Sequence, residues 1–233
     1  MRTDHTTMLA VLEGLASRTP TGDGKAAARE PAPFPSAEEV DIDLSVSGGE
    51  PERDLYETLS ARRSTLRYSP APVRTGPVLR LAQEALARDE EDWGEAVEAG
   101  PLEAFVFALR SEGLPEGVYR VTAEGCARVA PPDSIGDPED LGVQREFATG
   151  AGIVTLFAGL DRADAWAGPH GYRSVVVRAA MATYDIHLKL QAHGLVGTVF
   201  GGFIAAAVRA AAKSDGVTRH PLLSTTYAHR PDS

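Results

Sequence analysis

The chain has 233 residues, 43% of them hydrophobic, which suits one domain with extensions or at most two small domains. Its formal net charge of −10 argues against nucleic acid or an anionic membrane as the main partner. The single cysteine excludes an intramolecular disulfide, and the six histidines lack the paired spacing of a metal site.

The first 51 residues are expected to form an N-terminal extension, and residues 52–233 the folded domain. The N-terminus lacks the apolar run of a signal peptide, and no stretch is long enough to cross a membrane, so we expect a cytoplasmic protein. Residues 45–51 are typical of a linker. Because such a segment cannot bury enough apolar surface to order itself, we expect it to be partly disordered or to bind a partner.

Regular elements are predicted from residue 54 onward, by apolar periodicity and by the positions of glycine and proline. The predicted helices span 54–61, 77–88 and 172–193. The predicted strands span 103–109, 153–158 and 225–228, and a hairpin closed by Gly125 supplies another. Gly194 stands where a left-handed cap of the long helix is expected. Strands separated by helices indicate an α+β sandwich.

Two short motifs carry the functional signal. Arg62, Arg63 and Ser64 end a short helix and place two guanidinium groups and a hydroxyl together, which suits a phosphate. Gly201 and Gly202 follow the long helix, where backbone without a Cβ atom can lie against a flat ligand. The plainer alternatives are a solvated helix end for the first motif and a tight turn between two helices for the second.

The order and spacing of these motifs resemble the nitroreductase family over about residues 54–230. The matching stretches are Arg-Arg-Ser-x-x-Arg-Tyr at 62–68, Gly-Tyr-Arg at 171–173 and Gly-Gly-Phe at 201–203. By pattern, the chain looks most like the flavin-dependent azoline dehydrogenases, which finish thiazole and oxazole rings in modified peptides. The resemblance implies a nitroreductase-like sandwich, with a central antiparallel or mixed sheet, helices around it, and FMN at a dimer interface.

The resemblance also implies the site and the activity. The cofactor-binding residues that it implies are Arg62, Arg63, Ser64, Gly201, Gly202 and Arg230. The implied function is an FMN-dependent dehydrogenase of a modified peptide or a peptide-derived heterocycle. It would act as a homodimer, or as a heterodimer with a related or biosynthetic subunit. A rival within the same class is an NAD(P)H-dependent nitro or quinone reductase.

Several positions depart from the family pattern. Glu95 stands where a neutral hydrogen-bond donor is expected, and Arg178 stands where a glutamate is expected. Trp166 and Ala167 occupy the positions of a Lys-Tyr pair that is thought to remove a proton, and neither can act as a base. The motifs that define the fold therefore match the family better than the residues that would carry out its chemistry.

Without that pair, His170 and Tyr172 are the candidate catalytic residues, and His170 is preferred because histidine is the usual general base in proteins. A packed core aromatic is the alternative for Tyr172, and a free tail residue is the alternative for Arg230. The departures also keep open a function of another class. In that hypothesis the chain is a catalytically degenerate nitroreductase-like subunit that binds a partner enzyme or peptide without turnover.

Overall fold

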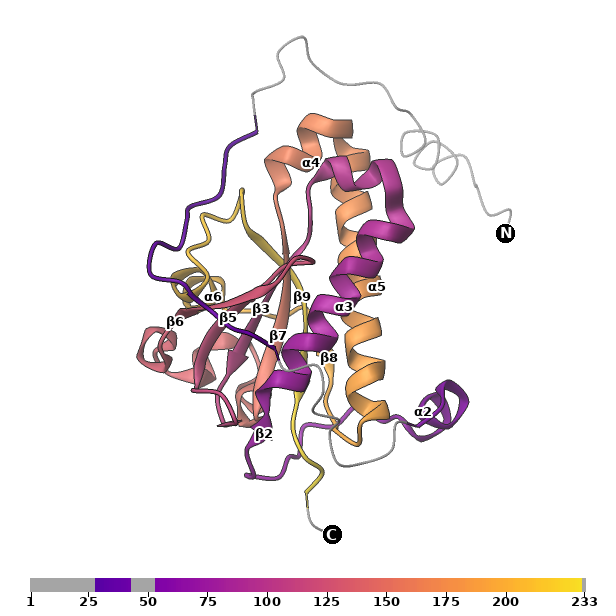
Figure 1. Ribbon diagram of the computed structural model, residues 1–233, viewed down its shortest axis with the longest axis vertical. Coiled ribbons are helices and arrows are strands. Elements are labelled where there is room, and N and C mark those ends of the chain that lie inside the picture. Colours follow the sequence, from indigo (N-terminus) through magenta and orange to yellow (C-terminus); the bar gives the residue numbers. More distant parts are fainter. Residues whose placement is uncertain (1–27, 43–52, 232–233) are drawn as a thin grey trace, which may run out of the picture.

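The computed structural model describes residues 28–42 and 53–231. A seven-stranded sheet, antiparallel throughout, forms the centre of the domain (Figure 1). In spatial order its strands are β1 (Glu38–Glu39), β6 (Cys126–Ala130), β5 (Gly117–Val121), β3 (Glu103–Ala108), β7 (Gly152–Ala158), β9 (His220–Tyr227) and β8 (Val199–Phe200). A small parallel pair consists of β2 (Val73–Arg74) and β4 (Ser111–Glu112).

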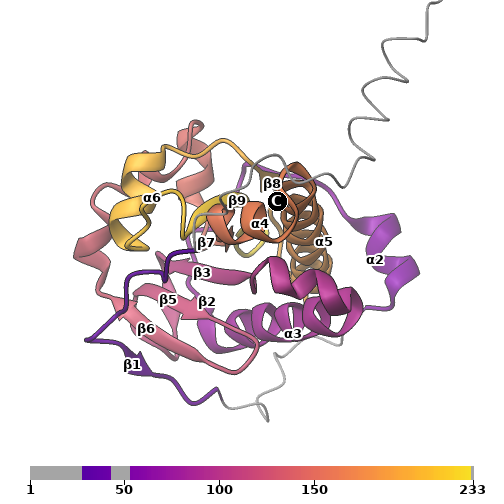
Figure 2. The same ribbon diagram turned by 90° about the horizontal axis from the view of Figure 1, so that it is seen from above.

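Helices cover both faces of the sheet, so the predicted α+β sandwich is confirmed (Figure 2). The α-helices are α2 (Leu55–Ala61), α3 (Thr75–Trp93), α4 (Leu160–Ala167), α5 (Pro169–Ala192) and α6 (Ala205–Ala211). The 3-10 helices are η1 (Gly94–Ala99), η2 (Pro132–Ile135), η3 (Pro138–Leu141) and η4 (Arg145–Thr149). Within the described ranges, no helix combines the length and the apolar character that a membrane span needs.

The buried strands explain the two layers. All six residues of β3 are buried, and successive side chains along a strand point to opposite faces. Val106 therefore joins the cluster beneath α3 and α5, whereas Phe105 and Phe107 join the second cluster with residues of α6 and η4. The alternation gives the sheet an apolar layer on each face.

The predicted elements are confirmed with shifted ends. The helix expected at 77–88 is longer, Thr75–Trp93, and the last strand begins at His220 rather than 225. The central helix starts at Pro169, because proline is tolerated in the first turn, where its missing N–H has no partner to lose. Gly194 has a φ of 81°, the left-handed conformation expected after this helix.

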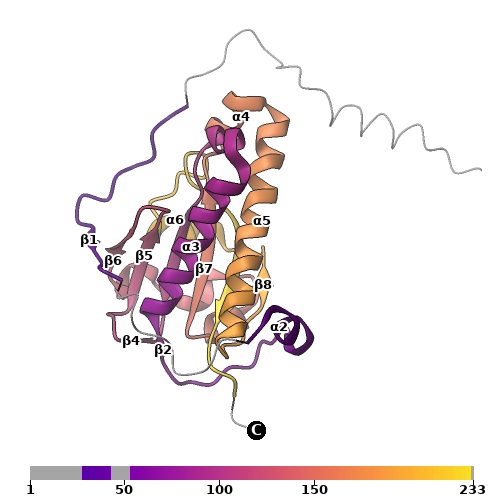
Figure 3. The same ribbon diagram turned by 45° about the vertical axis from the view of Figure 1, so that its right-hand side comes forward.

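Residues 28–42, part of the predicted extension, lie across the domain's own sheet (Figure 3). Phe34 packs against Phe105, with ring centroids 5.9 Å apart, and the Arg219 guanidinium lies 4.7 Å from the centre of the Phe34 ring. Strand β1 then pairs with the outer edge of β6, and Val40 packs against the core. The proposed division at residue 51 stays a prediction, and positions 1–27 and 43–52 lie outside the described residues.

Arg178 is a structural residue in the N-terminal half of the central helix. Its side chain is fully buried and its Nη2 donates to Oδ2 of Asp89 at 2.6 Å. Its Nη1 donates to the carbonyls of Ala96 and Gly100, at 2.9 and 3.0 Å. One guanidinium therefore joins α5 to α3, to the middle of η1 and to the residue that ends η1, which explains an arginine at this position.

Candidate active site

Three segments that are distant in sequence meet at the C-terminal end of α5. Ser64 forms an isolated parallel bridge with Gly197, and the Thr65 N–H donates to the Gly197 carbonyl at 3.3 Å. Val196 and Ala228 exchange two backbone hydrogen bonds, of 2.8 and 3.0 Å. The Arg-Arg-Ser loop, the segment after the long helix and the end of the chain thus form one structure.

A cavity of about 540 Å³ opens where these segments meet. Its lining combines small hydroxyl side chains, an amide, a guanidinium and apolar surface, and consists of Ser64, Thr65, Leu66, Arg67, Gln144, Phe147, Thr198 and Val199. Phe147 is held by stacking on Phe200, with ring centroids 3.9 Å apart and an interplanar angle of 17°. The size and the mixed lining are typical of a site for a small organic ligand.

The arginines of the first motif point to different places. Arg67 lines the cavity. The Arg62 guanidinium lies 5.9 Å from the centre of the Tyr184 ring, on the exposed side of α5. Arg63 turns back over α2, and its Nη1 donates to the carbonyls of Ser60 and Arg62 at 3.2 and 2.7 Å. The chain therefore directs Arg67, rather than Arg62 or Arg63, into the cavity.

The glycines after α5 differ in whether a side chain would fit at their positions. A Cβ atom on Gly197 would lie 2.0 Å from the Thr226 carbonyl oxygen, so this bridge requires glycine. A Cβ atom on Gly201 would lie 3.5 Å from the Leu223 side chain, and one on Gly202 would lie 3.5 Å from the Val143 side chain. Both distances are ordinary van der Waals contacts. Both glycines lie between β8 and α6, so the alternative of a turn between two helices is wrong. Nothing within the described chain demands glycine at 201 or 202.

Buried polar side chains of α5 and β9 pack behind the Arg-Arg-Ser loop. The His187 ring lies between Thr225 and Gln191, with Nδ1 2.9 Å from Oγ1 of Thr225 and Nε2 2.8 Å from Nε2 of Gln191. Burial, with a smaller contribution from the charge of Arg62, lowers the pKa of His187 from 6.5 to about 4. Burial also raises the pKa of Tyr68. Neither group is a general base at neutral pH within this arrangement.

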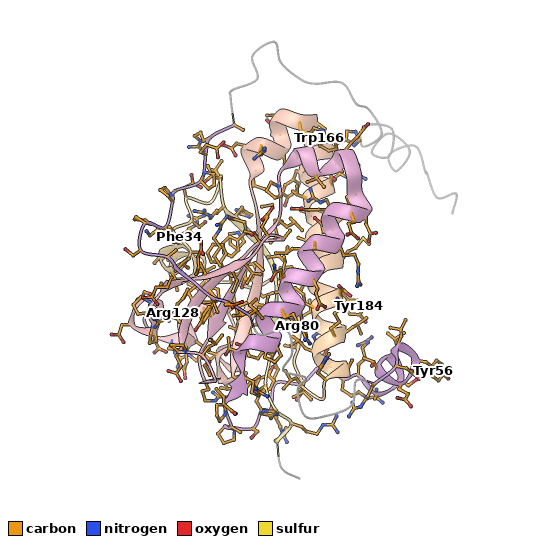
Figure 4. All side chains as sticks on the ribbon, viewed as in Figure 1. Phe34, Tyr56, Arg80, Arg128, Trp166 and Tyr184 are labelled. Atoms are coloured by element: carbon orange, nitrogen blue, oxygen red, sulfur yellow. The ribbon has the colours of Figure 1, made fainter. Side chains whose placement is uncertain are left out.

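His170 and Tyr172 lie at the other end of the same helix. Seventeen residues of helix, about 25 Å, separate His170 from His187. Figure 4 labels Trp166, which lies on α4 just before α5 begins, and Tyr184, which lies in the C-terminal half of α5. Tyr172 is 49% exposed and is therefore not a packed core aromatic. Within one chain, the structure does not bring His170, Tyr172 or Glu95 to the cavity.

Arg230 is at the cavity end. It is exposed and follows His229, whose carbonyl accepts the Ser69 N–H at 3.0 Å. The structure thus brings together Arg62, Arg63, Ser64 and Arg230 at one end of the domain, with Gly201 and Gly202 further along the same edge.

The fold has clear counterparts among solved structures. A protein from Anabaena variabilis classed as a nitroreductase has a TM-score of 0.68 and 18% sequence identity; the match covers 95% of this chain and 47% of that one. A chain of the E. coli microcin synthetase McbBCD complex, solved with truncated pro-MccB17 bound, has a TM-score of 0.58 and 16% identity, with 97% and 94% covered. The chain has the nitroreductase fold.

A further example with the nitroreductase fold, from Exiguobacterium sibiricum, was solved in complex with FMN; its TM-score is 0.53 and its identity 12%, with 78% and 91% covered. The chain spans about half the length of the Anabaena protein. No protein-family model and no curated protein matches the sequence.

Sequence reasoning missed part of the cavity. Arg67 was within the quoted motif, but nothing in its pattern showed that it, and not Arg62, lines the cavity. Gln144 and Phe147 come from the segment between β6 and β7, where no periodic pattern marks a site. Gly197 could have been found, because a second glycine three residues after the helix cap indicates a close backbone approach.

Proposed function

We propose that the chain is an FMN-dependent oxidoreductase. The observation that carries the proposal is the bridge between Ser64 and Gly197, which joins a phosphate-suited loop to a glycine-rich edge around one cavity. The presence of FMN in one structure of this fold supports the choice of ligand.

The residues of the cavity fit such a cofactor. Ser64 and Arg67 offer a hydroxyl and a guanidinium for a phosphate, with Arg62, Arg63 and Arg230 nearby as further positive charges. Gly201 and Gly202 leave open backbone that no contact within the described chain requires, which suits the face of a flat ring. When bound, FMN supplies the two-electron chemistry, and the protein supplies binding and orientation.

The cavity's own lining cannot remove a proton from a substrate. Its side chains are hydroxyl, amide, guanidinium or apolar groups, none of which is a base at neutral pH. His170 and Tyr172 remain the candidate catalytic residues, but they lie at the far end of α5. They can serve this cavity only if a second copy presents that end to it.

The exposed surface of α5 supports a dimer that does so. Val177, Met181 and Tyr184 are 38–53% exposed at helical spacing, and α2 adds Leu55 and Tyr56, which are 66% and 81% exposed. Large exposed apolar residues on adjacent elements are typical of an interface. Antiparallel pairing of two α5 helices would bring the α4–η1 end of one copy to the cavity end of the other.

Net charge favours the same antiparallel pairing: basic residues outnumber the acidic Asp54 and Glu57 at the cavity end, and acidic residues outnumber the basic Arg162 and Arg173 at the α4–η1 end. The exposed or half-exposed basic residues at the cavity end are Arg53, Arg62, Arg63, Arg67 and Arg230. The exposed acidic residues at the α4–η1 end are Glu91, Asp92, Glu95 and Asp164. A homodimer would place each basic end beside an acidic one, so the site would be completed in trans.

The substrate we propose is a modified peptide or a peptide-derived heterocycle of the azoline type. The McbBCD complex with its bound peptide supports this choice. Oxidation of an azoline ring to an azole removes two electrons and two hydrogens. One hydrogen would leave with both electrons as a hydride to the cofactor, from which oxygen would take them to give hydrogen peroxide. The other hydrogen would leave as a proton, accepted by His170 or by the phenolate of Tyr172. A cytoplasmic location stays a prediction.

The test is turnover of a thiazoline-containing peptide under air by flavin-loaded wild type, His170→Ala and Tyr172→Phe. We expect wild type to form thiazole and one of the two variants to lose about 100-fold or more in rate, as for removal of a general base. Equal rates in all three would contradict these catalytic roles. Turnover of nitro or quinone compounds with NAD(P)H, without thiazole formation, would favour the rival reductase.

A second candidate is a catalytically degenerate subunit that binds a partner enzyme or peptide. It is favoured by Trp166, which packs partly buried against the core where a proton-removing pair is expected, and by the exposed carboxylate of Glu95. A protein that forms a stable complex with a partner but refuses added FMN would support it. Flavin-dependent turnover by this chain alone would exclude it.

A further inference from the structure

Two partly buried chains of hydrogen bonds end on the carbonyl groups of Arg63 and Thr65, the residues on either side of Ser64. One reaches the Arg63 carbonyl from Gln191, at 3.5 Å, and the other reaches the Thr65 carbonyl from the Tyr68 hydroxyl, at 2.6 Å. Both begin at the neighbouring residues Thr225 and Thr226 of β9. These contacts lie behind the cavity wall that Ser64 forms.

The direction of the first chain follows from its ends. The Arg63 carbonyl can only accept, so Gln191 presents its NH₂ group to it. The same nitrogen lies 2.8 Å from Nε2 of His187, so Nε2 must accept as well. His187 therefore has its proton on Nδ1, which donates to Thr225 at 2.9 Å; the Thr225 hydroxyl in turn donates to the Thr226 carbonyl at 3.2 Å.

The second chain is directed by the same reasoning. Tyr68 has one hydroxyl hydrogen, and the Thr65 carbonyl takes it. The Thr226 hydroxyl, 2.9 Å away, therefore donates to the Tyr68 oxygen and accepts the Thr198 N–H, also at 2.9 Å. Thr198 itself lines the cavity, so this chain links two parts of the wall.

We propose that Gln191 and Tyr68 are positioning residues, which hold Ser64 at the cavity wall by fixing the carbonyls on either side of it. His187 and Thr225 act behind Gln191, and Thr226 acts behind Tyr68. This inference rests on the proposed function, because the ligand that it concerns is FMN. It requires His187 to be neutral and protonated on Nδ1.

The experiment titrates flavin-free protein with FMN and records the dissociation constant and the thermal midpoint before FMN is added. Gln191→Glu keeps the size of the side chain but replaces the donor with an acceptor, and Tyr68→Phe removes only the hydroxyl. Each should raise the Kd for FMN about 5- to 10-fold, the effect of about one hydrogen bond. Thr183→Val is the matched control, because Thr183 is buried on the same helix and its hydroxyl has no hydrogen-bond partner.

A spectroscopic measurement separates positioning from simple destabilisation. In ¹⁵N spectra of the wild type, the His187 ring should show protonated Nδ1 and unprotonated Nε2. In Gln191→Glu, the carboxylate should hold a proton on Nε2 as well, and His187→Gln identifies the signal. The other five histidines serve as internal references.

The outcomes distinguish the two proposals. Wild type that binds FMN, with unchanged Kd in both Gln191→Glu and Tyr68→Phe, would overturn the positioning roles and leave the proposed function standing. Wild type that binds no FMN would overturn the proposed function. In that case the protonation of the His187 ring still tests the proposed hydrogen-bond directions. A proton on Nε2 of wild-type His187 would overturn them, and a proton on Nδ1 alone would support them.

Discussion

The two ends of α5 are built by different physical means. In the N-terminal half, the buried ion pair of Arg178 and Asp89 joins helices to each other, and the donors of Arg178 are occupied by the protein itself. At the C-terminal end, neutral side chains support a loop whose outer surface, with Ser64 and Arg67, faces a cavity. A region that satisfies its own polar groups gives rigidity, whereas a region that leaves polar groups facing a cavity can bind a ligand.

The largest effect is expected from breaking the ion pair. Arg178→Ala leaves the Asp89 carboxylate buried without a partner, so the free energy of unfolding should fall by about 3–5 kcal/mol. Arg88→Ala is the control, since the Arg88–Asp185 pair is 55% and 27% exposed and should contribute at most about 1 kcal/mol. Denaturant unfolding measures both, and equal losses would contradict the distinction between the two pairs.

The next largest effect concerns the charge in the cavity. Arg67→Ala should weaken FMN binding by about 1.5–3 kcal/mol, roughly 10- to 100-fold, because a charge-assisted hydrogen bond to phosphate is lost. Arg62→Ala should weaken binding less, since that guanidinium lies over Tyr184. Titration of both variants with FMN checks this order. A greater loss for Arg62→Ala would restore the assignment expected from the sequence.

The glycine edge gives a smaller effect that separates folding from binding. Gly197→Ala forces a methyl group against the Thr226 carbonyl and should destabilise the domain by about 1–3 kcal/mol. Gly201→Ala meets no close contact, so it should leave the thermal midpoint nearly unchanged and lower only the affinity for FMN. Unchanged affinity in Gly201→Ala would argue that the flavin ring does not lie against this residue.

The effect that is smallest near neutral pH is on the pH dependence of stability, because it develops only below about pH 6.5. Because the pKa of His187 is lowered from 6.5 to about 4, the unfolded chain binds a proton in this range that the folded protein does not. The contribution of His187 to stability is therefore complete above pH 6.5 and is lost as the pH falls towards 4. Unfolding of wild type and His187→Gln across this range should show a flatter profile for the variant. Parallel profiles would contradict the lowered pKa.

The sequence predicted the fold well because its signals are local. The long helix was recognisable from the 22 residues 172–193, which include no glycine or proline, and Gly194 marked its end. The buried strands were recognisable from runs such as 103–109. By contrast, the structure has short elements that were not predicted, because they are too short to show a periodic pattern: α4, α6, β1, β2, β4, β8 and the 3-10 helices.

The site was predicted less completely, because side-chain direction depends on tertiary contacts. The sequence brought Arg62, Arg63 and Ser64 into one motif, but only the packing of Arg62 on Tyr184 shows which way that guanidinium points. The same holds for His187, whose neighbours Gln191 and Thr225 come from the same helix and from a distant strand.

The central claim is that the cavity beside Ser64 and Arg67 holds FMN. The most direct measurement is to purify the full chain, release any bound cofactor by heat and identify it by mass. The account predicts FMN in the wild type and a clear loss of it in Arg67→Ala, with Arg88→Ala retaining the wild-type amount. A colourless protein that refuses added FMN, or one that releases only FAD, would contradict the claim.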